Sequence, residues 1–351
     1  PEAYHALFNC LAQGKEAKDP FIDLEGVWNS VQVYRDQHRF YHWPLEFPDV
    51  LGPARAGGFS ATVGNPPWDV LQPSSQEFYT NYDPEFRKYK KQEAVKVIRR
   101  LHEGHPNIAA KWEAYESVFH EASSYFKEPL AYTSLNRGKI DLYKAFLERF
   151  FSILRADGEM GIVVPSGIYT DQGCLPLRKL FFAKSQVTFL YCFENRWPSV
   201  FSAVDGRFKF VVFGARKGGE THEVKCAFMQ HNSERLPAID ASPMTVSLEQ
   251  IERFSPDSLN IMEFCSQRAV ETINTIYGSH PLLREHCGES WNVVLTQDFN
   301  LTSDSHLFNR KGEGVELIEG KSFFSYDNGF GEVSLWIQDK YVRHKFLDRK
   351  W

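Results

Sequence analysis

One short run of residues in this chain has the types and order needed to hold a flat amine: Asn65-Pro66-Pro67-Trp68. The side-chain oxygen of Asn65 and the carbonyl oxygen of Pro66 are two acceptors for the two N–H groups of one amine. Each proline fixes its own φ and pushes the preceding residue toward an extended conformation, so the acceptors are rigid before a substrate arrives. Trp68 offers a flat apolar face to a ring. An amine held in this way would direct its lone pair at a sulfonium methyl carbon, and it needs no general base beforehand.

The position of this tetrad in the expected fold favours a functional interpretation. It follows a short apolar strand expected over residues 59–63, after Gly64. Open α/β sheets bind ligands at the carboxyl ends of their strands. The alternative is a strand end capped by prolines and followed by an ordinary surface loop, and the four residues alone do not exclude it.

The elements that must position the tetrad follow from the spacing of apolar residues. Three- and four-residue spacing predicts helices, and short apolar runs predict buried strands. Helices are expected at residues 3–13, 26–40, 140–154 and 175–183. Strands are expected at residues 59–63, 161–164, 187–193, 207–214 and 223–229, and residues 42–50 should be extended. The glycines of residues 217–220 predict a hairpin between the last two strands. This order is typical of the second half of a doubly wound, Rossmann-like α/β sheet.

A polar stretch of helical pattern, about residues 77–136, interrupts this order. It contains a cluster of basic residues: Arg87, Lys88, Lys90, Lys91, Lys96, Arg99 and Arg100. Two interpretations stay open for this cluster, a solvated helical insertion and a surface that contacts phosphates. Charge reversal distinguishes them, because lost phosphate contacts lower the salt dependence of binding.

Composition sets the remaining limits. The net charge is −5, so any contact with nucleic acid must be local, and aromatic residues make up 15% of the chain. No apolar run reaches the roughly 20 residues of a membrane-spanning helix, and no signal peptide is recognisable. Free thiols in a reducing compartment, with no metal site, are expected from the scattered cysteines: Cys10, Cys174, Cys192, Cys226, Cys265 and Cys287. Because the sequence begins at Pro1 rather than at Met, we expect it to be a piece of a longer protein.

The tetrad resembles motif IV of the amino-methyltransferases. Flanking segments resemble, in order, one branch of that family: the large gamma-class DNA adenine-N6 methyltransferases of fused restriction-modification enzymes and of BREX and DISARM phage defence. The segments that carry the resemblance are residues 42–50, 57–59, 64–68, 141–143, 146–148, 164–167, 170–171, 193–196, 201 and 204–210. Residues 304–308 and 319–321 are similar to the start of that branch's target-recognition region.

The resemblance implies an S-adenosyl-L-methionine-dependent enzyme that marks self DNA in the bacterial cytoplasm as part of antiviral defence. Asn65 and Pro66 would bind the N6 amine, and Pro67 and Trp68 would complete the catalytic tetrad. Phe201 would stack on an adenine flipped out of double-stranded DNA, opposite Trp68. Stacking of about 1–3 kcal/mol per base would offset part of the energy of extrusion. For Phe201 the alternative is a core aromatic beside a loop. Other subunits of a defence system are expected partners, and a membrane is not.

The resemblance also implies a division of the chain. Residues 1–235 would be part of a class I methyltransferase domain, residues 236–285 a connector, and residues 286–351 the start of a target-recognition domain. The family needs a glycine-rich loop for the cofactor, which precedes motif IV by a long stretch. Because no such loop stands in a credible setting here, we expect the cofactor-binding residues upstream of Pro1.

Two other functions remain open at this point. An enzyme with the same tetrad could act on a glutamine side chain or on RNA, although the long insertion and the recognition-like segment argue against it. A non-catalytic DNA-binding or scaffolding subunit with a degenerate methylase fold is favoured by the missing cofactor loop and disfavoured by the intact tetrad.

Overall fold

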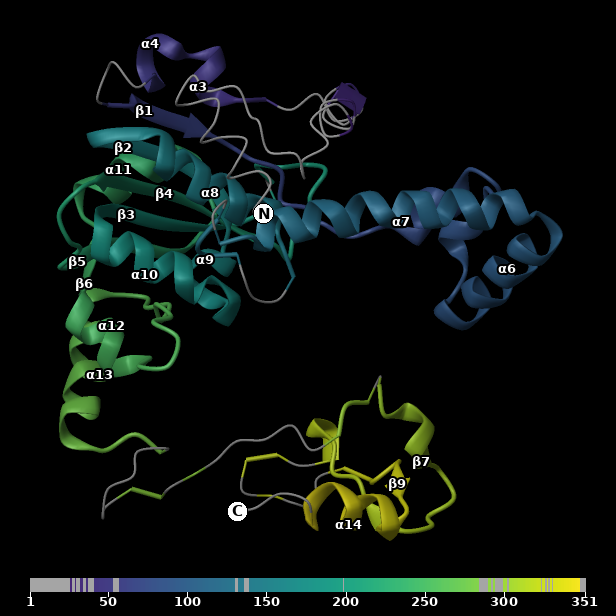
Figure 1. Cartoon of the computed structure of the whole chain (residues 1–351). Coiled ribbons are helices and arrows are strands. Elements are labelled where there is room, and N and C mark those ends of the chain that lie inside the picture. Colours follow the sequence, from purple (N-terminus) through teal and green to yellow (C-terminus); the bar gives the residue numbers. More distant parts are fainter. Residues whose placement is uncertain are drawn as a thin grey trace. The chain divides into compact units, whose positions relative to one another are not determined.

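A computed structural model of the chain describes residues 41–52, 57–129, 132–135, 139–197, 199–283 and 303–347 except 323, 326, 328 and 330, together with a few isolated positions. The chain divides into two compact units, Pro1–Ile276 and Tyr277–Trp351. Figure 1 shows the elements of both. The expected helix at residues 3–13 lies outside the described residues, as does most of the one at residues 26–40.

A sheet of six described strands lies at the centre of the first unit (Figure 1), in the order β1-β2-β4-β3-β5-β6. The strands are β1 (Phe59–Gly64), β2 (Leu154–Pro165), β3 (Ser185–Glu194), β4 (Lys209–Lys217), β5 (Glu223–Gln230) and β6 (Met244–Ser247). β1 is parallel to β2, and β3 is parallel to β5. β4 runs antiparallel to both β2 and β3, and β6 antiparallel to β5.

Helices cover both faces of this sheet. The helices of the first unit are α3 (Trp43–Glu46), α4 (Pro48–Leu51), α5 (Ser75–Thr80), α6 (Lys91–Gly104), α7 (Pro106–Lys127), α8 (Leu142–Ile153), α9 (Gly167–Thr170), α10 (Leu175–Lys184), α11 (Leu236–Ala241) and α12 (Leu248–Phe254), and α13 (Gln267–Ser279) crosses its boundary. Phe213 of β4 stacks edge-on against Phe181 of α10. The preceding residue, Val212, packs in a cluster with Ile239 of α11. Because successive residues of a strand point to opposite faces, α10 and α11 lie on opposite sides. The expected α/β class is confirmed.

The sequence pattern placed the sheet-covering helix α8 well. Its predicted apolar stripe is buried at Tyr143, Leu147 and Phe151, with Leu147 0% exposed. α10 also matches its expected range, and Pro176 occupies its first turn, where a missing N–H group leaves no bond unmade. The structure thus confirms both helices at the residues where apolar spacing predicted them.

β2 begins earlier than expected, at Leu154 instead of at residue 161. The strand follows α8 without a loop, and its pairing with β1 shifts between Phe59 and Ala61. Asp157 lies in this irregular stretch with a φ of 60°. Gly58, which directly precedes β1, has a φ of 107°, and a Cβ atom there would lie 2.4 Å from the Ile153 carbonyl oxygen. The backbone at Gly58 therefore lies too close to the start of β2 for a side chain, and only glycine fits beside this bulge.

The expected hairpin is wrong. β4 and β5 are consecutive in the sequence, but β3 lies between them in the sheet. Gly218 and Gly219 do make a turn with positive φ, of 105° and 73°. The chain then crosses to the far side of β3 instead of folding back on β4. β4 is buried along most of its length and finds antiparallel partners on both edges.

Residues 42–50 are not extended as expected but form the two short helices α3 and α4. Each helix carries a proline in its first turn, Pro44 and Pro48. Proline tolerates that position because the first N–H groups of a helix make no internal bond. The prolines therefore begin two helices here and do not keep the chain extended.

The other expected segments differ in detail. The insertion is helical as predicted, with α5, α6 and α7. The segment expected to be a connector contributes a strand to the sheet, because its β6 pairs with β5. α12 follows β6 and begins with a capping box of Ser247 and Gln250. The second unit has three very short strands, β7 (Phe308–Asn309), β8 (Val315–Glu316) and β9 (Trp336–Ile337), and also a helix, α14 (Asp339–Leu347). The roles expected for these parts stay predictions.

Candidate functional site

The tetrad lies at the edge of the sheet where the parallel strands end. β1 stops at Gly64, and Asn65 follows directly. Since β1, β2, β3 and β5 all point the same way, the residues after each of them share this edge. β4 runs the other way, so it begins here, at Lys209. This edge is where α/β sheets hold ligands.

Two sets of contacts fix the tetrad on its sheet. A Cβ atom on Gly64 would lie 3.0 Å from Phe150 of α8, so the helix approaches the strand end closely. Downstream, the Leu142 N–H donates to the Asp69 carbonyl oxygen at 2.9 Å, and the Leu71 N–H to the Ile140 carbonyl oxygen at 2.8 Å. The residues before the tetrad therefore contact the middle of α8, and the residues after it are hydrogen-bonded to the start of the same helix.

The two predicted acceptors are uncommitted within the described part of the chain. Asn65 is exposed, and no described group donates a hydrogen bond to its side-chain oxygen. Pro66 is buried, and its carbonyl oxygen accepts no hydrogen bond from a described residue. Pro67 is exposed and Trp68 half-buried. Two rigid acceptors without an internal partner can receive hydrogen bonds from a bound molecule.

The structure brings Trp68 and Phe201 together, although they are far apart in the sequence. Their ring centroids lie 5.3 Å apart with planes at 75°, an edge-to-face contact. Behind Phe201, Phe210 makes a second edge-to-face contact at 5.0 Å, and Phe193 stacks on Phe210 at 5.4 Å. The indole N–H of Trp68 is buried and has no hydrogen-bond partner among the described residues. The two rings thus pack against further aromatic side chains, and the indole N–H of Trp68 lacks a partner among the described residues.

Asn195, the first residue after β3, holds the loop that carries Phe201. Its side-chain amide donates to the carbonyl oxygens of Phe201 and Val204 at 2.8 and 2.9 Å, and its side-chain oxygen accepts from the Phe201 N–H at 2.9 Å. Its own N–H donates to the Phe208 carbonyl oxygen at 3.0 Å, which closes the loop. Asn195 is 1% exposed. Three bonds from one buried amide fix the backbone on which the Phe201 ring is mounted.

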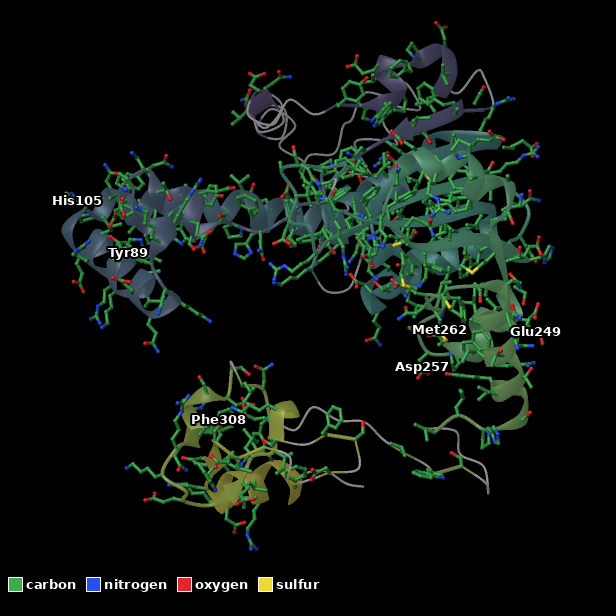
Figure 2. The ribbon with its side chains drawn as sticks, turned by 180° about the vertical axis from the view of Figure 1, so that it is seen from behind. Tyr89, His105, Glu249, Asp257, Met262 and Phe308 are labelled. Atoms are coloured by element: carbon green, nitrogen blue, oxygen red, sulfur yellow. The ribbon has the colours of Figure 1, made fainter. Side chains whose placement is uncertain are left out.

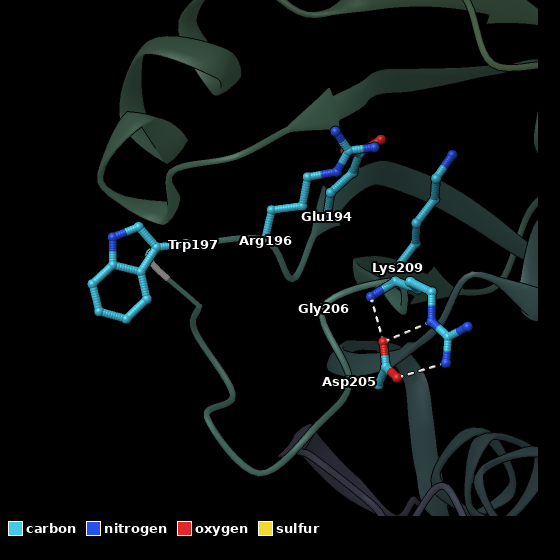
Figure 3. A pocket seen from close by; sticks show the side chains of 7 residues that line it. Glu194, Arg196, Trp197, Asp205, Gly206 and Lys209 are labelled. Atoms are coloured by element: carbon cyan, nitrogen blue, oxygen red, sulfur yellow. Dashed lines mark hydrogen bonds and ion pairs between the residues drawn. The ribbon is translucent and has the colours of Figure 1, made fainter.

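The outer side of this loop borders a surface hollow of about 460 Å³ (Figure 3). Its cations are paired within the chain, since Arg207 binds Asp205 through both carboxylate oxygens and Arg196 contacts Glu194 at 2.8 Å. Hydrogen bonds from Arg207 lower the pKa of Asp205 to about 2. Trp197, turned away from the other lining side chains in Figure 3, is 92% exposed. The hollow is thus ringed by satisfied ion pairs rather than by free cations.

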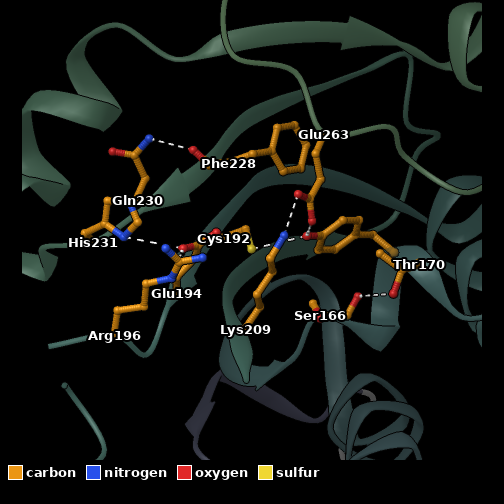
Figure 4. A network of polar contacts seen from close by, with 11 residues as sticks. Ser166, Thr170, Cys192, Glu194, Arg196, Lys209, Phe228, Gln230, His231 and Glu263 are labelled. Carbon is orange, nitrogen blue, oxygen red and sulfur yellow. Dashed lines mark hydrogen bonds and ion pairs between the residues drawn. The ribbon is translucent and has the colours of Figure 1, made fainter. Parts of the chain in front are cut away.

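A polar network fastens the segment after α12 to the same edge (Figure 4). Lys209 and Tyr169 both donate to Glu263 at 2.6 Å. Burial would raise the pKa of Glu263, but the hydrogen bonds from Lys209 and Tyr169 outweigh it and hold that pKa below its usual range. Nearby, the buried Arg178 donates to the carbonyl oxygen of Ser258. The network is structural, since its groups satisfy one another.

The structure brings the expected site residues to one edge of the sheet: Asn65, Pro66, Pro67, Trp68 and Phe201. Their chemical roles stay predictions. Asn195 was not among the expected site residues, although its segment, residues 193–196, carries part of the resemblance. Among the described residues, no group of histidine, cysteine and acidic side chains could hold a metal ion, and no described helix is long and apolar enough to cross a membrane.

Comparison with known families gives one match. Residues 116–200 are similar to the family described as Eco57I restriction-modification methylase. The matched range runs from within α7 to the loop after β3, so it includes Asn195 and the strands β2 and β3 but neither the tetrad nor Phe201. Among curated proteins, none matches.

Solved structures of restriction-modification proteins resemble parts of this chain. They include the methyltransferase subunit of a type I system from Streptococcus thermophilus, at 16% identity over 58% of this chain and 37% of that chain, with a TM-score of 0.33. The EcoKI M protein is 13% identical over 39% of this chain and 42% of its own, with a TM-score of 0.29. A modification subunit of a putative type I restriction enzyme from Vibrio vulnificus YJ016 is 13% identical over 32% and 28%, with a TM-score of 0.27. The chain spans less than half the length of each.

Proposed function

We propose that this chain is the target-base part of an S-adenosyl-L-methionine-dependent DNA adenine-N6 methyltransferase that marks self DNA in a bacterial restriction-modification or phage-defence system. One observation carries the proposal: Asn65 and Pro66, two rigid acceptors that no described residue uses, stand at the carboxyl end of β1 beside two aromatic rings in contact. The similarity of residues 116–200 to restriction-modification methylases supports it.

In the proposed reaction Asn65 and Pro66 accept the two N–H groups of the adenine amine, so that its lone pair points away from the ring plane. S-adenosyl-L-methionine, when bound, supplies the methyl group. Trp68 and Phe201 hold the faces of the flipped base, and the amine loses its proton after the transfer. We assign no residue of this chain to the cofactor, because the acceptors and the rings account for the base alone.

The test is methyl transfer to unmodified genomic DNA by the full-length protein and by its Asn65→Ala variant. Loss of one preorganised hydrogen-bonding group reduces a rate by about 10²–10³-fold, so N6-methyladenine should fall by that factor. Asn107→Ala removes an exposed asparagine from α7 and serves as the control. An unchanged adenine methylation pattern in Asn65→Ala would disprove the proposal.

The same experiment separates the other functions. Methylated RNA or glutamine, with unmodified DNA, would identify a different substrate for the same tetrad. DNA binding without any methyl transfer, with Asn65 intact and cofactor present, would instead indicate a non-catalytic DNA-binding subunit.

A further inference from the structure

The helical insertion forms an arm with a core of its own. α6 and much of α7 extend away from the sheet in both views, with Tyr89 and His105 at the far end in Figure 2. The core of the arm consists of Tyr79, Phe86, Val97 and Ile108, packed against Phe78, Ala94, Ile98, Leu101, Trp112 and other partly buried residues. Ala94, Val97, Ile98 and Leu101 recur at helical spacing, so one face of α6 is fixed inward.

The outward side of α6 and the turn before it is basic. All seven cations of the cluster are exposed: Arg87, Lys88, Lys90, Lys91, Lys96, Arg99 and Arg100. The 14 residues 87–100 hold these seven, and no separate window of that length elsewhere in the sequence holds more than five lysines and arginines. We call the seven exposed lysines and arginines of residues 87–100 the basic face.

Most of the charge on the basic face is not neutralised by described residues. Lys88 contacts Glu85, Arg99 contacts Glu103 and Arg100 contacts Asp83. Such exposed pairs are weak and open to competition. In the described part of the chain, no acidic side chain lies within ion-pair distance of the other four cations, which are Arg87, Lys90, Lys91 and Lys96. By contrast, Arg196, Arg207 and Lys209 near the tetrad are all paired.

The position of two lysines gives a second, independent argument. Lys90 is the N-cap of α6 and Lys91 its first residue, and the Lys90 side chain makes no capping bond. A helix N-terminus carries partial positive charge, so cations there oppose helix stability and an acidic residue would favour it. Residues that break a local rule are typical of functional sites. Folding of the arm therefore gives no reason for these lysines.

We propose that the basic face of α6 contacts the phosphate backbone of duplex DNA without reading its sequence. The proposal rests on the proposed function, which makes DNA the substrate. From Lys90 to Arg100 the helix rises about 15 Å, and duplex DNA carries about one charge per 1.7 Å of axis. A protein of net charge −5 needs such a local positive field to attract a polyanion.

The decisive variant is Lys90→Glu with Lys91→Glu in the full-length protein. It should keep or raise the melting temperature, because acidic residues suit this helix end, and yet bind duplex DNA more weakly. For two lost phosphate contacts, the slope of log affinity against log salt should fall by about 2. Random-sequence duplexes and target-containing DNA should be affected by equal factors. The measurement is fluorescence anisotropy at several salt concentrations.

Lys179→Glu with Lys225→Glu is the matched control, with the same charge change at two exposed lysines of α10 and β5. It should leave the salt slope unchanged. Equal slopes for the variant of the basic face and the wild type would overturn the proposal, whether or not methyl transfer persists. A slope lowered by about 2 in a protein that never methylates adenine would support the phosphate contacts of the basic face and overturn the proposed function alone.

Discussion

The contact between Phe201 and Trp68 must change before a base can stack between the two rings. A base stacked between two rings needs them parallel and about 7 Å apart, two van der Waals separations. Here the centroids are 5.3 Å apart at 75°. One ring must turn before a base enters. The indole N–H of Trp68 has no partner among the described residues, so that ring has no such hydrogen bond to lose. Asn195 holds the backbone of Phe201.

Asn195→Ala should therefore impair catalysis more than binding. The change removes three hydrogen bonds from the Phe201 loop and leaves the Phe201 N–H and two carbonyl groups without that partner. Misplacement by about 1 Å costs a rate about 100-fold, so methyl transfer should fall by about that factor while duplex affinity stays the same. Extrusion of a 2-aminopurine placed at the target adenine, followed by its fluorescence, should fall too.

Asn232→Ala provides the comparison, because Asn232 also follows a strand and caps a short turn through its side chain. It should leave methyl transfer intact. Asn195 would be no positioning residue if its variant lost stability alone, with transfer and fluorescence as in the wild type.

At the scale of elements, the segment after α12 is part of the sheet's support. The N–H of Ile261 donates to the Tyr169 carbonyl oxygen, and Asn260 donates to the Thr170 carbonyl oxygen. Glu263 joins the same region to β4 through Lys209. A segment that the sequence indicated as a connector thus fixes α9, which directly follows β2.

Glu263→Gln should make the melting temperature of the protein depend less on pH in acid. The pKa of Glu263 is lower in the folded chain than its ordinary value of 4.5. A carboxylate with a depressed pKa stabilises the fold above its ordinary value, and this contribution disappears as the pH falls through the folded pKa. The wild type should exceed the variant in melting temperature at pH 7, and the gap should close below pH 4.5. Thermal unfolding at several pH values measures it.

Glu249→Gln, which breaks an exposed pair with Arg253 one helical turn away, controls for removal of a surface carboxylate. A gap between wild type and Glu263→Gln that persists unchanged at low pH would contradict this account.

At the scale of the whole molecule, the two compact units have separate buried cores. In the first, Leu147 of α8 is 0% exposed, and in the second, Ile337 of β9 is 1% exposed. Because the chain divides into two compact units, damage to one of them should remain local.

Leu147→Ala and Ile337→Ala form a reciprocal pair. Each substitution leaves a cavity in its unit, and such changes lower the free energy of unfolding by about 2–5 kcal/mol. Hydrogen exchange should accelerate in β2 and β3 for the first variant and in β9 and α14 for the second. Acceleration in both units from either change would mean that they unfold together.

Several features of this protein follow from the sequence by itself. The spacing of apolar residues predicts α8 and α10, because burial of one helical face is a local pattern. The strand before the tetrad follows from its short apolar run, and the acceptors of Asn65 and Pro66 follow from the chemistry of four neighbouring residues. The basic face is visible as a dense run of cations.

Only the tertiary structure decided the rest. The order of strands depends on which edges are left to pair, so β4 lies beside β3 although its turn glycines suggested a hairpin with β5. The contact of Trp68 with Phe201 arises because parallel strands end at one edge of the sheet. The role of Asn195 depends on a loop that closes only when β3 and β4 pair. Such contacts join residues distant in sequence, and no local spacing encodes them.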